Sequence, residues 1–293
     1  MNNTQKLANK TAVVTGANSG IGYYTSLHLA AKGTHVIMAC RDEQKATQAI
    51  EKIKSTTPNA KLDFIKLDLN SLNSVKNCAE QIKDKYPPIN FLVNNAGVMT
   101  PPKFTKTVDN FELQFGVNYL GHFAFTGHLL EHMQNLKDSR VVTLGSLAHH
   151  QGSIDFANLN SEKKYSGAMA YAQSKMACIM FAYELQRRLK ASNKLIESLS
   201  AHPGWAATEL QRDSLLLRML NPVFSQSSEA GAMPTLRALT DESATGGEYY
   251  GPGGFLGFKG SPKKVKSKAT SYNENMAIQL WEQSQKLTGV NYL

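Results

Sequence analysis

The sequence predicts an α/β fold built on a single doubly wound, Rossmann-type parallel sheet of about seven strands, with helices on both faces. Short apolar runs alternate with helical stretches along the 293 residues, a glycine-rich turn follows the first run, and hydrophobic residues make up 42% of the chain. Strands that alternate with helices form parallel sheets covered on both sides. One domain of this class can reach this length, so we expect a single domain over residues 1–293.

The alternation continues along most of the chain. Strands are expected at 10–15, 34–40, 62–67, 91–93, 140–144, 195–200 and 248–251, and helices after residue 20 and at 43–55, 71–85, 109–136, 167–189 and 271–287. In doubly wound sheets, ligands bind beyond the carboxyl ends of the strands. The residues that directly follow strands should therefore gather at one rim, and they are Gly16, Arg41, Asp68, Asn95, Ser146 and Pro203.

The turn after the first strand reads Thr15-Gly16-Ala17-Asn18-Ser19-Gly20-Ile21-Gly22 and runs into a helix. Glycines let the backbone approach a pyrophosphate, and the free N–H groups of a helix N-terminus attract its charge. The spacing G-x-x-x-G-x-G is neither the G-x-G-x-x-G fingerprint nor a P-loop. The turn predicts a dinucleotide site formed by Gly16, Asn18, Ser19, Gly20, Ile21 and Gly22; a turn without a ligand is the alternative.

The end of the second strand indicates which dinucleotide binds. An acidic side chain there would bind the ribose 2′-hydroxyl of NAD, whereas an arginine accommodates the 2′-phosphate of NADP. The chain has Cys40-Arg41-Asp42, which favours NADP(H) over NAD(H) through Arg41. Asp42 lies about twenty residues beyond Gly22, where a ribose-binding acid would stand, but it also opens the helix at 43–55. We therefore interpret Asp42 as an N-cap.

Tyr171 and Lys175 are four residues apart within the expected helix at 167–189, so they share one face. A cation beside a phenol favours the phenolate, and such a pair can transfer a proton to or from an oxygen near neutral pH. An isolated pair with this spacing is usually a surface contact. The accompanying dinucleotide motif favours the catalytic interpretation.

These motifs occur in the order typical of the classical short-chain dehydrogenase/reductase family, which the chain resembles over about residues 8–250. The matching positions are 15–22, 94–97, Asn118, Ser146, Tyr171, Lys175 and Pro203-Gly204. Within the family the chain looks like the retinol dehydrogenase group and its bacterial relatives, through residues 39–42, 146–150 and 170–175 and the interval of 25 residues from Ser146 to Tyr171. Protochlorophyllide oxidoreductase is a weaker resemblance.

The resemblance implies a catalytic role for four residues. Tyr171 would protonate a carbonyl during reduction or act as the base toward an alcohol, and Lys175 would assist it and bond the nicotinamide ribose. Ser146 would orient the substrate oxygen, and Asn118 would hold a water that links Lys175 to solvent. The further cofactor contacts that the resemblance implies are Asp68, Leu69, Asn95, Ala96, Gly97, Pro203, Gly204 and Thr208.

Two departures from the retinol group bear on the substrate. Gly145 stands where that group more often has a second serine, which could loosen the substrate side of the site. No membrane anchor precedes the first strand, and residues 1–9 are polar, so we expect a cytoplasmic protein. Cys40, Cys78 and Cys178 are scattered, which indicates reduced thiols rather than a disulfide framework, and no metal site is expected.

The net charge is +9, and five lysines (259, 263, 264, 266 and 268) lie close together. An acidic partner or an anionic headgroup would fit them, but a solvated loop is the simpler interpretation, and no nucleic-acid partner is expected. The expected partner is a small apolar carbonyl or alcohol substrate. The resemblance is also compatible with a homo-oligomer.

The apolar segment at about 205–233 predicts a lid over such a substrate, with a pair of short helices as the alternative. A C-terminal extension at about 252–293 follows, whose glycine-rich run 251–258 is expected to form another wall. His149 or His150 is expected at the substrate mouth, whereas His202 is interpreted as structural.

The sequence therefore favours an NADP(H)-dependent oxidoreductase, a short-chain enzyme that acts on the CH–OH group of an apolar substrate such as an aldehyde, a ketone or a retinoid- or lipid-like molecule. A double-bond reductase of the protochlorophyllide type is the first alternative. A dinucleotide sensor without activity is the second; it is disfavoured because Ser146, Tyr171 and Lys175 are all present.

Overall fold

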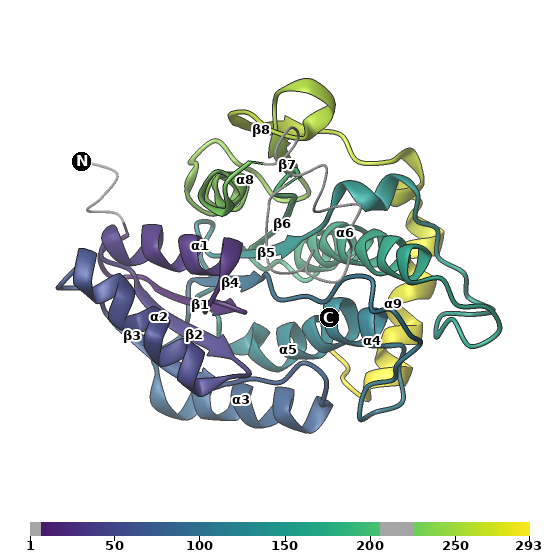
Figure 1. Ribbon diagram of the computed structural model, residues 1–293, viewed down its shortest axis with the longest axis horizontal. Coiled ribbons are helices and arrows are strands. Elements are labelled where there is room, and N and C mark those ends of the chain that lie inside the picture. Colours follow the sequence, from purple (N-terminus) through teal and green to yellow (C-terminus); the bar gives the residue numbers. More distant parts are fainter. Residues whose placement is uncertain (1–6, 206–225) are drawn as a thin grey trace.

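Eight strands form one sheet in the order β3-β2-β1-β4-β5-β6-β7-β8 in the computed structural model, which describes residues 7–205 and 226–293 (Figure 1). Their bounds are β1 Thr11–Thr15, β2 His35–Cys40, β3 Leu62–Lys66, β4 Phe91–Asn94, β5 Arg140–Leu144, β6 Glu197–Ala201, β7 Tyr249–Pro252 and β8 Pro262–Val265. Strands β1 to β7 pair in parallel, whereas β8 runs antiparallel to β7. The strand order reverses between β1 and β4, where sheets of this kind bind ligands.

Helices cover both faces of the sheet (Figure 1). One face carries α1 (Gly20–Ala31), α2 (Glu43–Thr56) and α8 (Ser228–Thr240), and the other carries α3 (Leu72–Lys85), α5 (Gly121–Leu129), α6 (Gly167–Ala191) and α9 (Glu274–Thr288). Alternate residues of β1 serve the two layers, because Val13 packs in one cluster and Val14 in the other. Strands buried on both faces are near-continuously apolar, which is why short apolar runs predicted them.

All seven expected strands are confirmed, with ends that differ by no more than two residues. The sequence analysis missed β8, whose residues Pro262-Lys263-Lys264-Val265 are typical of an edge strand because a proline and charges discourage further pairing. The prediction of a solvated loop was therefore wrong for Lys263 and Lys264, which lie on this strand. Lys264 pairs with Glu248 at 2.6 Å.

The expected continuous helix at 109–136 was also wrong. The helical residues begin with α4 (Leu113–Phe115), continue through a π-helix (Gly116–Leu120) into α5, and end in a 3₁₀-helix (Leu130–His132). Asp109 instead lies in a loop and accepts a hydrogen bond from the backbone of Leu72 at 2.7 Å. This contact joins residues 37 positions apart, so the helical periodicity of 109–136 could not reveal that the first residues form a loop.

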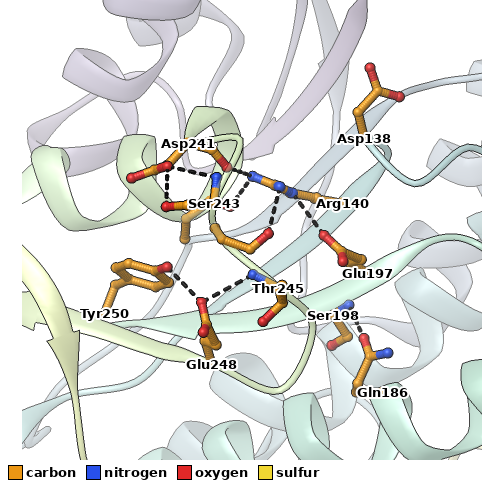
Figure 2. A network of polar contacts seen from close by, with 12 residues as sticks. Asp138, Arg140, Gln186, Glu197, Ser198, Asp241, Ser243, Thr245, Glu248 and Tyr250 are labelled. Atoms are coloured by element: carbon orange, nitrogen blue, oxygen red, sulfur yellow. Dashed lines mark hydrogen bonds and ion pairs between the residues drawn. The ribbon is translucent and has the colours of Figure 1, made fainter.

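A buried arginine joins the sheet to α8 (Figure 2). Arg140 begins β5 and makes an ion pair with Glu197 of β6 at 3.3 Å. Its guanidinium also donates to the backbone carbonyls of Ala238, Asp241 and Ala244 at 2.8–3.0 Å. The two charged side chains are only 6% and 11% exposed, so the network stabilises the amino ends of β5 and β6 in a dry environment.

The C-terminal part of the chain packs against the main layers. Trp281 of α9 is 1% exposed, as its expected apolar position predicted, and its ring lies 5.0 Å from that of Phe123 in α5. Most of the expected lid (206–225) and Thr208 lie outside the described residues, whereas α8 begins at Ser228. None of the described helices combines the length and apolar character needed to cross a membrane.

Candidate active site

The glycine turn between β1 and α1 leaves no room for side chains. Gly16 has a φ of +63°, a left-handed conformation that favours glycine. A Cβ on Gly22 would lie 2.3 Å from the carbonyl oxygen of Gly16 and 2.5 Å from the side chain of Asn95. Ser19 is the N-cap of α1 but makes no side-chain capping bond, and no acidic residue occupies the first turn. The bare turn and the uncapped N–H groups suit an anion.

Thr15 and Asn95 hold the ends of β1 and β4 together beside this turn. The hydroxyl of Thr15 accepts the backbone N–H groups of Asn95 and Ala96, both at 2.9 Å. In return, the Asn95 amide donates to the carbonyl of Thr15 at 2.8 Å. The predicted residues Asn95 and Ala96 therefore lie next to the glycine turn. The sequence analysis missed Thr15, although its position at the junction of strand and turn is a usable signal.

The end of β2 lies beside the same turn. The Gly16 N–H donates to the Ala39 carbonyl at 2.9 Å. Burial raises the pKa of the Cys40 thiol to about 12, although the backbone N–H groups of Ala17 and Asn18 hydrogen-bond to it. Arg41 follows directly and is exposed. Asp42 caps α2 by accepting the Lys45 N–H at 3.0 Å, which confirms its structural interpretation.

Tyr171 and Lys175 lie on one face of α6, as predicted. The Lys175 ammonium is 5.9 Å from the centre of the Tyr171 ring and donates to the Leu144 carbonyl, at the end of β5, at 3.0 Å. The lysine is only 6% exposed, whereas Tyr171 is partly exposed. A Cβ on Gly97 would stand 3.8 Å from the ammonium. A buried cation therefore lies between the phenol and the predicted cofactor loop.

Asn118 occupies the middle of the π-helix and joins that helix to its neighbours. Its side chain exchanges hydrogen bonds with the backbone of Val98 at 2.7 and 2.9 Å, and it donates to Ser174 of α6 at 3.0 Å. Its carbonyl lies 2.9 Å from Nδ1 of His122 and 3.2 Å from the Cys178 sulfur. These contacts make Asn118 a brace between the loop after β4 and α6. Its role in a proton relay stays a prediction.

Ser146 follows β5 and begins a 3₁₀-helix (Leu147–His150) that packs on α6. Its hydroxyl oxygen accepts the Ala148 N–H at 3.2 Å, which leaves the hydroxyl hydrogen available to a substrate oxygen. The prediction that Gly145 loosens the substrate side was wrong. A Cβ on Gly145 would point into the core, 2.8 Å from Ile179 and 3.2 Å from the hydroxyl of Tyr249.

A cavity of about 290 Å³ adjoins the Ser146 turn. Leu147, His150, Pro252 and Leu256 are among the residues that line it, so the run 251–258 forms one wall of this cavity. Its role as a wall of the substrate site stays a prediction. Of the two histidines expected at the mouth, His150 lines the cavity, whereas His149 is fully buried. The other predicted cofactor residues lie at the same rim: Asp68 and Leu69 after β3, and Pro203 and Gly204 after β6.

Comparisons with known proteins agree with this arrangement. A family model described as short chain dehydrogenase matches residues 10–216, more than half of the chain. The chain belongs to the short-chain dehydrogenase family. It is 40% identical to retinol dehydrogenase 13 of Homo sapiens, over 96% of this chain and 85% of that protein, and 37% identical to polyprenol dehydrogenase of Homo sapiens, over 96% and 86%. The crystal structure of an uncharacterized protein from Mycobacterium paratuberculosis is similar with a TM-score of 0.82, at 36% identity over 98% of this chain and 96% of that one.

Members of the short-chain dehydrogenase family are oxidoreductases that use a nicotinamide dinucleotide. The residues of this chain fit such a cofactor. The uncapped start of α1 suits its pyrophosphate, and the close packing of Gly16 and Gly22 against the ends of β1 and β4 holds the turn in place beside it. Gly97 packs against Asn118 and lies near Lys175. This short-chain dehydrogenase therefore brings the predicted cofactor turn and the predicted residues Asn118, Ser146, Tyr171 and Lys175 to one rim of the sheet.

Buried histidines of this short-chain dehydrogenase surround the site and are held uncharged. Burial lowers the pKa of His122 to about 4 and that of His202 to about 3. His122 lies 2.9 Å from the Thr15 hydroxyl, and His202 accepts the Gly204 N–H at 3.2 Å. His202 is thus structural, as expected. Charging either ring would place a cation in a dry environment.

We expect the stability of the protein to fall as the pH drops from 6.5 toward 4. In the unfolded chain the histidine pKa values are near 6.5, so these rings bind protons in this window, whereas the native rings stay neutral. The unfolded state is therefore stabilised relative to the native state as the pH falls. His122 and His202 should each lower the free energy of unfolding by about 1–2 kcal/mol between pH 6.5 and pH 5. Urea unfolding at pH 7, 6 and 5 measures this dependence. A His122→Asn variant should show a shallower slope, and an unchanged slope would contradict the assignment.

Proposed function

We propose that this protein is an NADP(H)-dependent oxidoreductase that interconverts the carbonyl and alcohol of an apolar substrate, with Tyr171 as general acid and base. The observation that carries the proposal is the buried Lys175 ammonium, 5.9 Å from the Tyr171 ring on one side and beside Gly97 on the other. When bound, the nicotinamide supplies or accepts the hydride.

The proton is handled by Tyr171 and Lys175. In the reductive direction, the Tyr171 hydroxyl donates its proton to the carbonyl oxygen, which becomes the alcohol. The phenolate left behind is stabilised by the Lys175 cation, which the Leu144 carbonyl holds in place. In the oxidative direction the same phenolate removes the alcohol proton. Ser146 donates a hydrogen bond to the substrate oxygen and aligns it with Tyr171.

An apolar substrate is supported by two observations. Leu147, Leu256 and Val265 give one part of the cavity beside the Ser146 turn an apolar lining, whereas Lys263 and Lys266 line another part. Two relatives are named for apolar isoprenoid alcohols, retinol and polyprenol, and each is matched over more than 80% of its length. We therefore propose long-chain or isoprenoid aldehydes, ketones and alcohols as the substrate class.

A cofactor titration followed by a substrate panel tests the proposal. The purified protein should bind NADPH more tightly than NADH and should oxidise NADPH in the presence of retinal or of medium-chain aldehydes. Nicotinamide absorbance at 340 nm gives the rate. Tight binding without turnover of any carbonyl would contradict the catalytic proposal, and absence of binding would contradict the assignment of the glycine turn.

Arg41 is expected to select NADPH. Because charge-assisted hydrogen bonds contribute about 1.5–3 kcal/mol, Arg41→Ala should weaken NADPH binding roughly 10- to 100-fold and leave NADH binding nearly unchanged. Fluorescence titration of both cofactors measures the difference. Asp42→Ser is the matched control because serine keeps the N-cap of α2. If Asp42→Ser weakens NADH binding while Arg41→Ala changes nothing, the protein uses NADH instead.

A further inference from the structure

The catalytic serine turn is held by residues from the far end of the chain. The turn covers residues 146–152, from Ser146 through the 3₁₀-helix to Gly152. The segment that contacts it contains Lys268, which lies beyond the matched family region of residues 10–216. In the structure, Lys268 directly precedes a second 3₁₀-helix (Ala269–Tyr272) and is partly buried.

His149 is the first of two links between them. Its Nε2 lies 3.1 Å from the backbone nitrogen of Lys268, and its Nδ1 lies 2.5 Å from the carbonyl oxygen of Ser146. A backbone N–H can only donate, so Nε2 must be the acceptor, and the ring hydrogen must be on Nδ1. The imidazole therefore donates to the Ser146 carbonyl. Its side chain is fully buried and its ring meets that of Tyr249 edge to face at 5.6 Å, so it has little freedom to turn.

The Lys268 side chain provides the second link. Its ammonium donates to the carbonyl of Gly152 at 2.9 Å, at the other end of the turn. Gly152 lies against α6, because a Cβ there would stand 2.3 Å from the carbonyl oxygen of Ala172, the residue after Tyr171. Lys268 thus holds both ends of the turn, directly at Gly152 and through His149 at Ser146. The turn also packs against α6 next to Tyr171.

We propose that His149 and Lys268 form a clamp that positions the Ser146 hydroxyl relative to Tyr171, so that the C-terminal segment determines the alignment of the substrate oxygen. The proposal rests on the proposed role of Ser146. Neither residue of the clamp reaches the substrate; both act through the backbone of the turn. Reacting groups misplaced by about 1 Å can lose about a hundredfold in rate, so small shifts of this turn matter.

Two substitutions at one position separate the two links. Lys268→Pro removes both links, because proline has neither the N–H that His149 accepts nor the ammonium that binds Gly152, and the φ of −56° at this residue is compatible with proline. The difference between Lys268→Pro and Lys268→Met therefore reports the N–H link. Lys268→Met keeps the N–H and removes only the bond to Gly152. His149→Phe keeps an aromatic ring at this position but removes the imidazole nitrogens that bond the Lys268 N–H and the Ser146 carbonyl. Lys286→Met, at an exposed lysine of α9 in the same C-terminal segment, is the matched control.

The clamp predicts a roughly 10- to 100-fold lower kcat for Lys268→Pro and His149→Phe, a smaller loss for Lys268→Met, and no change for Lys286→Met. NADPH affinity and KM should stay close to those of the unaltered protein. Lys268→Arg should restore most of the activity lost in Lys268→Met. Circular dichroism melting of each variant identifies any that fails to fold; Lys268→Met, which changes one partly exposed side chain, then carries the test.

A double-mutant cycle with Ser146→Ala distinguishes positioning from general destabilisation. If the clamp acts through Ser146, Lys268→Pro should lower kcat in the unaltered protein but have little further effect in Ser146→Ala. Additive losses, or full activity of Lys268→Pro, would overturn the clamp. If Ser146→Ala itself keeps full activity, the proposed role of Ser146 fails instead, so the two failures can be told apart.

Discussion

Replacing Tyr171 by phenylalanine is expected to lower kcat by about 10²- to 10⁴-fold, the range that general acid–base catalysis contributes. Phenylalanine preserves the ring and its packing on α6 but has no proton to give to a carbonyl oxygen. The Lys175 ammonium remains 3.0 Å from the Leu144 carbonyl in this design, so the cofactor side of the site is unaltered. Steady-state kinetics with NADPH and an aldehyde, together with fluorescence titration of NADPH, measure both properties.

Tyr165→Phe is the matched control. Tyr165 is also partly exposed, and its hydroxyl donates to the Pro101 carbonyl at 3.3 Å and has a further hydrogen bond with the Gln114 side chain. Loss of the Tyr165 hydroxyl should leave kcat within about twofold, because this hydroxyl has no predicted role in proton transfer. It should lower stability by only about 1 kcal/mol, the usual contribution of a neutral hydrogen bond. Full activity of Tyr171→Phe would contradict the proton-transfer role, and a parallel loss of NADPH binding would indicate a damaged site rather than a missing proton.

The second large effect is expected on stability. Arg140→Met should lower the free energy of unfolding by about 3–5 kcal/mol, because it leaves the buried Glu197 carboxylate without its cation and removes the donors to three carbonyls (Figure 2). The lost contacts lie at the amino ends of β5 and β6, at the opposite end of these strands from Ser146 and the other predicted site residues. Urea unfolding followed by circular dichroism measures the loss.

Two further variants control this experiment. Lys194→Met breaks a surface pair with Glu131, which is 78% exposed, and should cost no more than about 1 kcal/mol. In Arg140→Met/Glu197→Met, the uncompensated charge is gone, so part of the lost stability should return. An Arg140→Met variant as stable as Lys194→Met would show that the network contributes little.

Local sequence patterns predicted the parts of the site that lie close together along the chain. The glycine turn, the i,i+4 pair Tyr171 and Lys175, and the N-cap Asp42 are each set by a few neighbouring residues, and the structure has them where the sequence placed them. The common rim followed from parallel topology alone, since the carboxyl ends of parallel strands meet at one edge.

Contacts between distant segments could not be predicted in this way. Gly145 was expected to loosen the substrate side because the retinol group more often has a serine at this position, but only the packing of Ile179 and Tyr249 shows that a Cβ there would face the core. His149 or His150 was expected at the mouth because both follow Ser146, but His149 is buried and its partner, Lys268, lies 119 residues away. The strand β8 was not predicted because its proline and two lysines break the apolar run by which the other strands were identified.

The π-helix at Gly116–Leu120 has a consequence for how this sequence can vary. A π-helical turn contains one residue more than an α-helical turn, which is equivalent to an insertion absorbed within a helix. Losing one codon here would restore a regular α-helix with all of its backbone hydrogen bonds, yet it would rotate the preceding residues by about 100° relative to α5. Asn118 would then leave Val98 and Ser174. Insertions and deletions in this stretch are therefore constrained by geometry, even where point substitutions are tolerated.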